Sequence, residues 1–249
     1  MRAATLALLG MVLLQARPPA KIDVRCTPEQ IDELGLSCTA EQPCPIYLEL
    51  TSAESTTGRL FVAGNLHTNS ATLSSILLAS EDGGNTWSEP HPRITSAVLD
   101  EIQFIDLQDG WIGGHVMQNL PRDPFLLVTI DGGKTWTRKP VSEESRTGAL
   151  EGFWFESRNS GTLIVDLIRP NETGGRHERY RTMTGGDSWT LEEVSARPLS
   201  LKRGPVREPV WRVRADAKSR SFVLERNLGA GEWETTAKFP IEVGSCAAQ

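Results

Sequence analysis

The octet SEDGGNTW occupies residues 80–87, and TIDGGKTW repeats it at residues 129–136. A weaker copy, TMTGGDSW, begins at residue 182, and a fourth, RNLGAGEW, begins at residue 226. The four copies therefore start 49, 53 and 44 residues apart. Repeats of about 40–50 residues are typical of β-propeller blades, each of which contains four short strands.

A second phrase keeps the same period. FIDLQDGWIGG at residues 104–114 is echoed 51 residues later by FESRNSGTLIV, and Gly58 lies 52 residues before Gly110. Short apolar runs bounded by Gly, Pro, Asn and Asp indicate strands throughout. We therefore predict an all-β fold, a small β-propeller of four blades of about 50 residues, over residues 44–249. The expected blades are 44–95, 96–147, 148–195 and 196–246.

The octet pattern Ser/Thr-x-Asp-x-Gly-x-Thr-Trp resembles the Asp-box of BNR repeat proteins. Its alternation with DGWIGG resembles the photosystem II stability and assembly factor type of propeller. The matching residues are Ser80, Asp82, Gly84, Thr86 and Trp87, and then Thr129, Asp131, Gly133, Thr135 and Trp136. The third copy keeps Thr182, Gly186, Ser188 and Trp189 but has Thr184 in place of Asp, and the fourth keeps little beyond Trp233.

The chemistry of the octet favours a structural role over a ligand site. Its glycines suit a turn with positive φ, and the Asp carboxylate can accept backbone N–H groups across that turn. The Ser or Thr hydroxyl adds another local hydrogen bond, and the Trp can cover the hairpin. Calcium or sugar binding through the Asp is the alternative.

The N-terminal residues 1–20 have the features of a secretory signal peptide. Arg2 precedes the apolar run AATLALLGMVLL, and small residues follow. The run is shorter than the roughly 20 apolar residues that span a membrane. We expect an exported periplasmic or extracellular monomer without a membrane span, and the net charge of −6 argues against nucleic acid as a partner.

Residues 21–43 are predicted to form an N-terminal segment with a short helix. Thr27 is the expected N-cap, Pro28 takes the first helical position, Gln30 completes a capping box, and Gly35 ends the helix.

Four cysteines in an exported chain predict two disulfides, and they lack the spacing of a zinc site. A closed ring joins its last blade to its first, as in the four-bladed hemopexin-type propellers that this arrangement resembles. Cys44 precedes the first blade and Cys246 follows the last, so we expect a Cys44–Cys246 disulfide, which leaves Cys26 to pair with Cys38.

The residues of known hydrolytic sites are sparse. Sialidases, which carry Asp-boxes, need an arginine triad and a Tyr nucleophile paired with Glu, but only Tyr47 and Tyr180 are present, and Arg93 lacks the usual Arg-Ile-Pro context. A carboxylate pair for glycoside hydrolysis could come from a cluster that otherwise consists of solvated turn residues: Asp100, Glu101, Asp106 and Asp109. The four histidines show no metal spacing, so we assign no catalytic, metal or cofactor residue and expect no cofactor.

The segment 197–226 contains nine basic residues in an acidic chain. We predict that it forms a partner-binding face. Its candidate residues are Arg203, Arg207, Arg212, Arg214 and Arg220. The predicted function is a non-catalytic binding or assembly platform for a protein or glycan partner. The alternative is a secreted glycan-active hydrolase of the Asp-box superfamily. Asn171 lies in a glycosylation sequon, NETG.

Overall fold

The computed structural model describes residues 19–22, 24–167, 176–204 and 210–247. Arg207 and Asn171 lie outside these ranges. So does the predicted signal peptide, apart from its last two residues. The described chain is nearly all β, with one short helix, α1 (Pro28–Glu33). No helix in the described ranges is long and apolar enough to cross a membrane.

The strands form four sheets, named here in the order in which the chain builds them. The first sheet has the strand order β1 (Val24–Arg25), β16 (Glu242–Cys246), β2 (Cys44–Thr56), β3 (Arg59–His67), β4 (Thr72–Ser80). The second contains β5 (Ala97–Phe104), β6 (Gly110–Met117), β7 (Pro121–Thr129) and β8 (Thr137–Pro140). The third contains β9 (Gly148–Phe155), β10 (Gly161–Leu167), β11 (Arg176–Thr182) and β12 (Thr190–Ser195), and the fourth contains β13 (Trp211–Asp216), β14 (Ser221–Gly229) and β15 (Glu232–Pro240).

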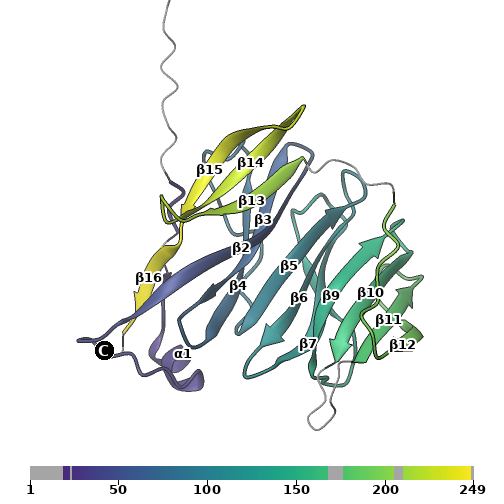
Figure 1. Ribbon diagram of the computed structural model, residues 1–249, viewed down its shortest axis with the longest axis horizontal. Helices are drawn as coiled ribbons and strands as arrows, with labels where there is room; N and C mark the ends of the chain where they lie inside the picture. The colour runs from purple at the N-terminus through teal and green to yellow at the C-terminus, as the bar shows by residue number, and fades with distance from the viewer. Residues whose placement is uncertain (1–18, 23, 168–175, 205–209, 248–249) are drawn as a thin grey trace, which may run out of the picture.

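Within each of the four units, consecutive strands pair antiparallel, as the predicted blades require. Three apolar clusters fill the spaces between the sheets. One joins the fourth sheet and the N-terminal segment to the first sheet, through Phe239 and Leu224. A second lies between the first and second sheets around Phe61, and a third lies between the second and third sheets around Phe155. Figure 1 shows the resulting stack, in the order fourth, first, second, third. This arrangement is consistent with a β-propeller.

The glycines of the octets mark where one sheet packs on the preceding one. A Cβ on Gly84 would lie 2.8 Å from Thr236 Cγ2 on β15, and one on Gly133 would overlap the ring of Phe61 on β3. A Cβ on Gly186 would make only ordinary contact with Leu126 of β7, at 3.5 Å. Around Gly229 and Gly231 of the fourth copy, nothing lies within 4 Å of an added Cβ. The predicted closed ring of four blades is therefore not confirmed by these contacts.

The predicted fourth blade, 196–246, differs from the structure in the strands that it contains. The described residues 196–204 contain no strand, so the fourth sheet has three strands. The end of the predicted unit also departs from the expectation, because β16, within residues 242–246, pairs with β2 of the first sheet. On one face of the fourth sheet, Arg212 and Arg214 share Glu225.

The predicted helix is confirmed, including its cap. Thr27 accepts a hydrogen bond from the Gln30 backbone N–H, and the Gln30 side chain accepts one from the Thr27 backbone. Gly35 has a φ of +60°, the left-handed conformation that ends the helix.

The predicted disulfide pairing is wrong, because the bonds are Cys26–Cys246 and Cys38–Cys44. Cys44 and Cys246 are indeed opposite each other on β2 and β16. However, β1 runs parallel to β16 on its other side, which brings Cys26 to Cys246. The chain then turns back through α1, and Cys38 meets Cys44 only six residues later. A disulfide still joins the two ends of the described fold, but the partner of Cys246 is Cys26 and not Cys44.

Candidate functional site

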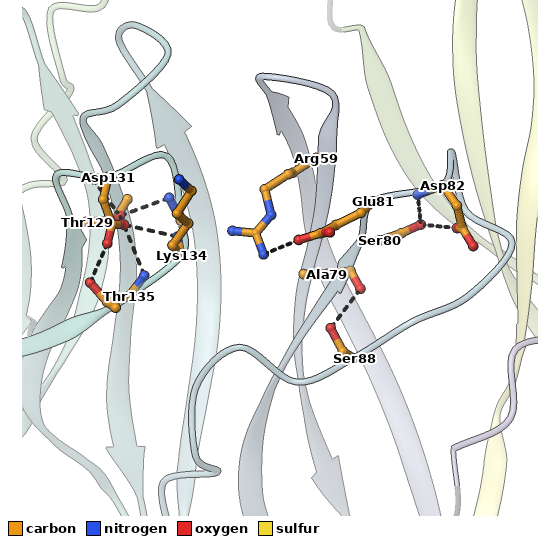
Figure 2. Close-up of polar contacts among 11 residues, drawn as sticks. Arg59, Ala79, Ser80, Glu81, Asp82, Ser88, Thr129, Asp131, Lys134 and Thr135 are labelled. Atoms are coloured by element: carbon orange, nitrogen blue, oxygen red, sulfur yellow. Dashed lines mark hydrogen bonds and ion pairs between the residues drawn. The ribbon is translucent and has the colours of Figure 1, made fainter.

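The first two octets form the same hydrogen-bonded turn. Ser80 Oγ donates to Asp82 Oδ1 at 2.8 Å and accepts the backbone N–H of Gly84 at 2.8 Å. Asp82 in turn accepts the backbone N–H and the hydroxyl of Thr86, at 2.9 and 2.7 Å. Asp131 repeats these contacts with Thr129 and Thr135, as Figure 2 shows.

The third octet keeps the turn but changes its centre. The Thr184 hydroxyl replaces the carboxylate, accepting the Ser188 backbone N–H at 2.9 Å and contacting the Ser188 hydroxyl at 3.0 Å. The fourth copy is a β14–β15 hairpin in which Gly229, Ala230 and Gly231 all have positive φ. Its Trp233 lies 3.9 Å beneath the guanidinium of Arg212.

The tryptophans of the first three turns contact phenylalanines, and Trp136 is buried while Trp87 and Trp189 are partly exposed. Trp87 meets Phe239 of the fourth sheet, with ring centroids 5.0 Å apart, while Trp136 meets Phe61 and Phe104 at 5.8 and 5.9 Å. Trp189 meets Phe155 at 6.2 Å. These contacts join or cover sheet layers.

The carboxylates of both complete turns are occupied by internal donors. Burial acts to raise the pKa of Asp131, but hydrogen bonds from Thr135, Thr129 and the Lys134 backbone outweigh it and lower the pKa to about 2. The pKa of Asp82 is also lowered, chiefly by the Thr86 hydroxyl and backbone N–H. Since these oxygens already accept several bonds, the geometry favours a structural role for both residues.

We expect Asp131→Asn to lower the thermal midpoint by about 2–4 °C near neutral pH, because the charged acceptor of four hydrogen bonds is lost. The folded pKa lies below the unfolded one, so the stabilisation is present above about pH 4 and is lost as the pH falls towards 2. Thermal melts of both proteins from pH 7 to pH 2 should therefore converge at low pH. A difference that stays constant over that range would contradict the role of the charge.

A groove runs between the first two turns, at the end of the molecule where the octets lie. It is lined by Thr57, Gly58, Arg59, Glu81, Leu107, Gln108, Ile130, Asp131 and Lys134. Figure 2 shows the Arg59 side chain reaching from β3 into the space between the turns. Its Nη2 atom donates to Glu81 Oε1 at 2.6 Å.

The groove combines unpaired donors with exposed apolar side chains. Arg59 Nε and Nη1 are buried, and no acceptor for them is found among the described residues. Leu107 and Ile130 are 63% and 59% exposed on its rim. Sequence reasoning missed this groove, because Arg59 and Lys134 are 75 residues apart and only the packing of the two sheets brings their turns together.

The predicted arginine face is largely neutralised by ion pairs. Arg203 binds Glu101 of β5 through two bonds of 2.5 and 3.0 Å. Arg212 and Arg214 both contact Glu225, and Arg220 Nη2 lies 3.6 Å from a Glu242 oxygen. Glu101 and Glu242 come from outside the basic segment, so its sequence overstated the free positive charge.

The predicted carboxylate cluster is dispersed. Asp106 accepts the backbone N–H groups of Gln108 and Asp109 within one turn, at 2.7 Å each. Asp109 is buried, which raises its pKa, and lies 3.6 Å from Arg158. Asp100 alone faces a histidine, with its Oδ2 3.2 Å from His115 Nδ1.

Glu151 and His177 form an acid–histidine pair that resembles Asp100 and His115, and Glu151 lies one repeat after Asp100. Asp100 and Glu151 both sit at β-bulges, in β5 and β9, and are 39% and 36% exposed. His177 Nδ1 lies 3.0 Å from Glu151 Oε2, so each carboxylate is backed by a buried imidazole. Bulges re-aim side chains near functional sites. The 51-residue spacing of these two acids was a signal in the sequence that the octets concealed.

Tyr180 and Glu178 on β11 form a hydrogen-bonded pair. The Tyr180 hydroxyl donates to the fully buried Glu178, and Arg146 contacts both side chains. Burial and then the Glu178 hydrogen bond raise the pKa of Tyr180, so its phenol stays protonated at neutral pH. In the described ranges, no group of His, Cys, Asp and Glu is arranged to hold a metal.

No protein-family model matches the sequence, and no curated protein matches it either. Among solved structures, the chain is similar to a Penicillium chrysogenum α-L-arabinanase complexed with arabinobiose, at 12% identity and a TM-score of 0.39, over 80% of this chain and 62% of that one. It is also similar to an ulvan lyase, at 9% identity and a TM-score of 0.43, over 80% and 52%. The YCF48 protein of Cyanidioschyzon merolae matches at 15% identity and a TM-score of 0.28, over 79% and 72%. The chain thus spans about half to three fifths of the first two structures, and the likeness concerns general fold alone.

Proposed function

We propose that this chain is an exported, non-catalytic binding module of the β-propeller type. The groove between the first two turns is the observation that supports this most, because it offers Arg59 donors and exposed aliphatic side chains without a free carboxylate pair. The two disulfides fit an oxidising compartment outside the cytoplasm. The partner would be a protein or a glycan.

A glycan-active hydrolase is the second candidate. It is favoured by Asp100 and Glu151, which are half-exposed at equivalent bulges and are backed by His115 and His177. Glycoside hydrolysis uses two carboxyl groups about 5–10 Å apart, so this candidate depends on the separation of these two acids on adjacent sheets.

The two functions are separated by one activity measurement. The purified chain is incubated with neutral and acidic polysaccharides, and the release of reducing ends is compared with that of Asp100→Asn and Glu151→Gln. A binding module releases none above a heat-inactivated control. Release that both substitutions abolish would establish the hydrolase and overturn our proposal.

The groove is tested by capture of a partner from the native medium or envelope. We expect Lys134→Glu, at an exposed position of the groove, to abolish capture, while the exposed Arg197→Glu leaves capture unchanged. Capture that is equal for both variants would place the binding surface elsewhere.

A further inference from the structure

The groove between the octet turns contains a guanidinium whose hydrogen-bonding capacity is mostly unused. Arg59 is 18% exposed, and only its Nη2 atom has a partner among the described residues, Glu81. The buried Nε and Nη1 atoms carry three N–H groups. Buried donors without acceptors are costly, so they call for an explanation such as a ligand.

The surroundings hold this guanidinium in place. Thr57 and Gly58 have φ values of +46° and +79°, which form the tight turn that starts β3 at Arg59. The Cζ atom of Arg59 lies 5.8 Å from the centroid of Phe61, whose ring is held in turn against Gly133. Both edges of a guanidinium that present two parallel N–H donors include Nη2, so an oxyanion bound in this way takes the place of Glu81 on that atom.

The charges that line the groove balance, with Arg59 and Lys134 against Glu81 and Asp131. Lys134 adds a second cation at the exposed edge of the groove. The carboxylate of Asp131 is already occupied by the donors of its own turn. Glu81 is 71% exposed and uses a single Arg59 nitrogen, so it can move aside.

The lining distinguishes between a peptide and a sugar. A sugar ring presents flat C–H faces that pack well on aromatic rings, and the residues that line the groove include no aromatic side chain. Leu107 and Ile130 instead offer two exposed aliphatic contacts, which suit peptide side chains. Resting on the proposed binding function, we infer that the groove binds an acidic peptide segment, with a side-chain carboxylate on Arg59 and a neighbouring aliphatic side chain against Leu107 and Ile130.

The probe is a fluorescein-labelled hexapeptide of alternating glutamate and leucine, measured by fluorescence anisotropy with the full chain. A matched peptide with glutamine in place of glutamate should bind at least tenfold more weakly. Arg59→Lys, which keeps the charge but loses the fork, should weaken binding about tenfold. Glu81→Gln, which removes the competing carboxylate, should tighten binding about threefold.

Arg59→Lys and Glu81→Gln are expected to change peptide affinity in opposite directions, and this distinguishes a role in binding from a role in folding. If the Arg59–Glu81 pair were only structural, both substitutions would lower stability and neither would change peptide binding. The exposed Arg93–Glu89 pair, with bonds of 2.8 and 2.6 Å, is the matched control. We expect Arg93→Lys and Glu89→Gln to leave binding unchanged.

Two results would overturn the inference while leaving the binding function intact. One is equal binding of the glutamate and glutamine peptides. The other is binding of an oligogalacturonate, in place of the peptide, that Arg59→Lys weakens, since the ligand would then be an acidic glycan. Capture of a partner that neither Lys134→Glu nor Arg59→Lys affects would exclude the groove altogether.

Discussion

Replacing both Cys26 and Cys246 by serine should lower the free energy of unfolding by about 5 kcal/mol. The bond joins residues separated by 220 positions, so on the chain-entropy account its loss frees nearly the whole unfolded chain. It also releases β1 from β16 at the edge of the first sheet. Urea denaturation under non-reducing conditions measures the change.

The second disulfide provides the control for this prediction. Cys38 and Cys44 are six positions apart, and the same account gives about 2 kcal/mol for their double serine variant. The chemical change is identical, so the difference isolates the length of the closed loop. Equal losses would contradict the account, and a non-reducing peptide map that links Cys44 to Cys246 would contradict the pairing itself.

The substitution Gly133→Ala should lower the free energy of unfolding by about 3 kcal/mol. Gly133 has a φ of +78°, which costs an alanine about 1 kcal/mol. The added methyl group would also overlap the ring of Phe61, in the cluster between the first two sheets, and overpacking of this kind costs about 1–3 kcal/mol.

Gly83→Ala is the matched control within the other complete turn. Gly83 has a similar φ of +69°, but nothing lies within 4 Å of its added Cβ, so we expect a loss of only about 1 kcal/mol. Chemical denaturation of both variants gives the comparison. Losses of the same size would show that the close approach of the two sheets is unimportant for stability. Since Phe61 lies beside Arg59, Gly133→Ala should also weaken binding in the groove.

Local features were predictable because short-range chemistry decides them. The octets contain within eight residues the acceptor, the donors and the glycines of their turn, and the structure has the hydrogen bonds that this composition predicts. The same holds for the helix cap at Thr27, where donor and acceptor are three residues apart. The turns also change as the octet sequence becomes less complete. In the third copy the Thr184 hydroxyl substitutes for the carboxylate, and the fourth copy is a plain hairpin.

The candidate sites were less predictable, because long-range pairing decides them. The acidic partners of Arg203 and Arg220 lie outside the basic segment in the sequence. The number of basic residues in the segment therefore overestimated the positive charge of its surface. The predicted carboxylate cluster included Asp100 but not Glu151, the other acid that lies at a β-bulge. The cluster was defined by closeness in the sequence, and Glu151 is 51 residues away from Asp100.

The sequence by itself determined the repeat, the all-β class, the turns and the capped helix, since each depends on residues within one turn or one period. Only the tertiary structure decided which cysteines pair, which sheet receives β16, and that Arg59 lies across a groove from Lys134. Cys44 faces both Cys246 across the ladder and Cys38 along the chain, so its local sequence allows either bond. The position of β1 beside β16 resolves the choice, because it places Cys26 next to Cys246, and no local pattern specifies that pairing.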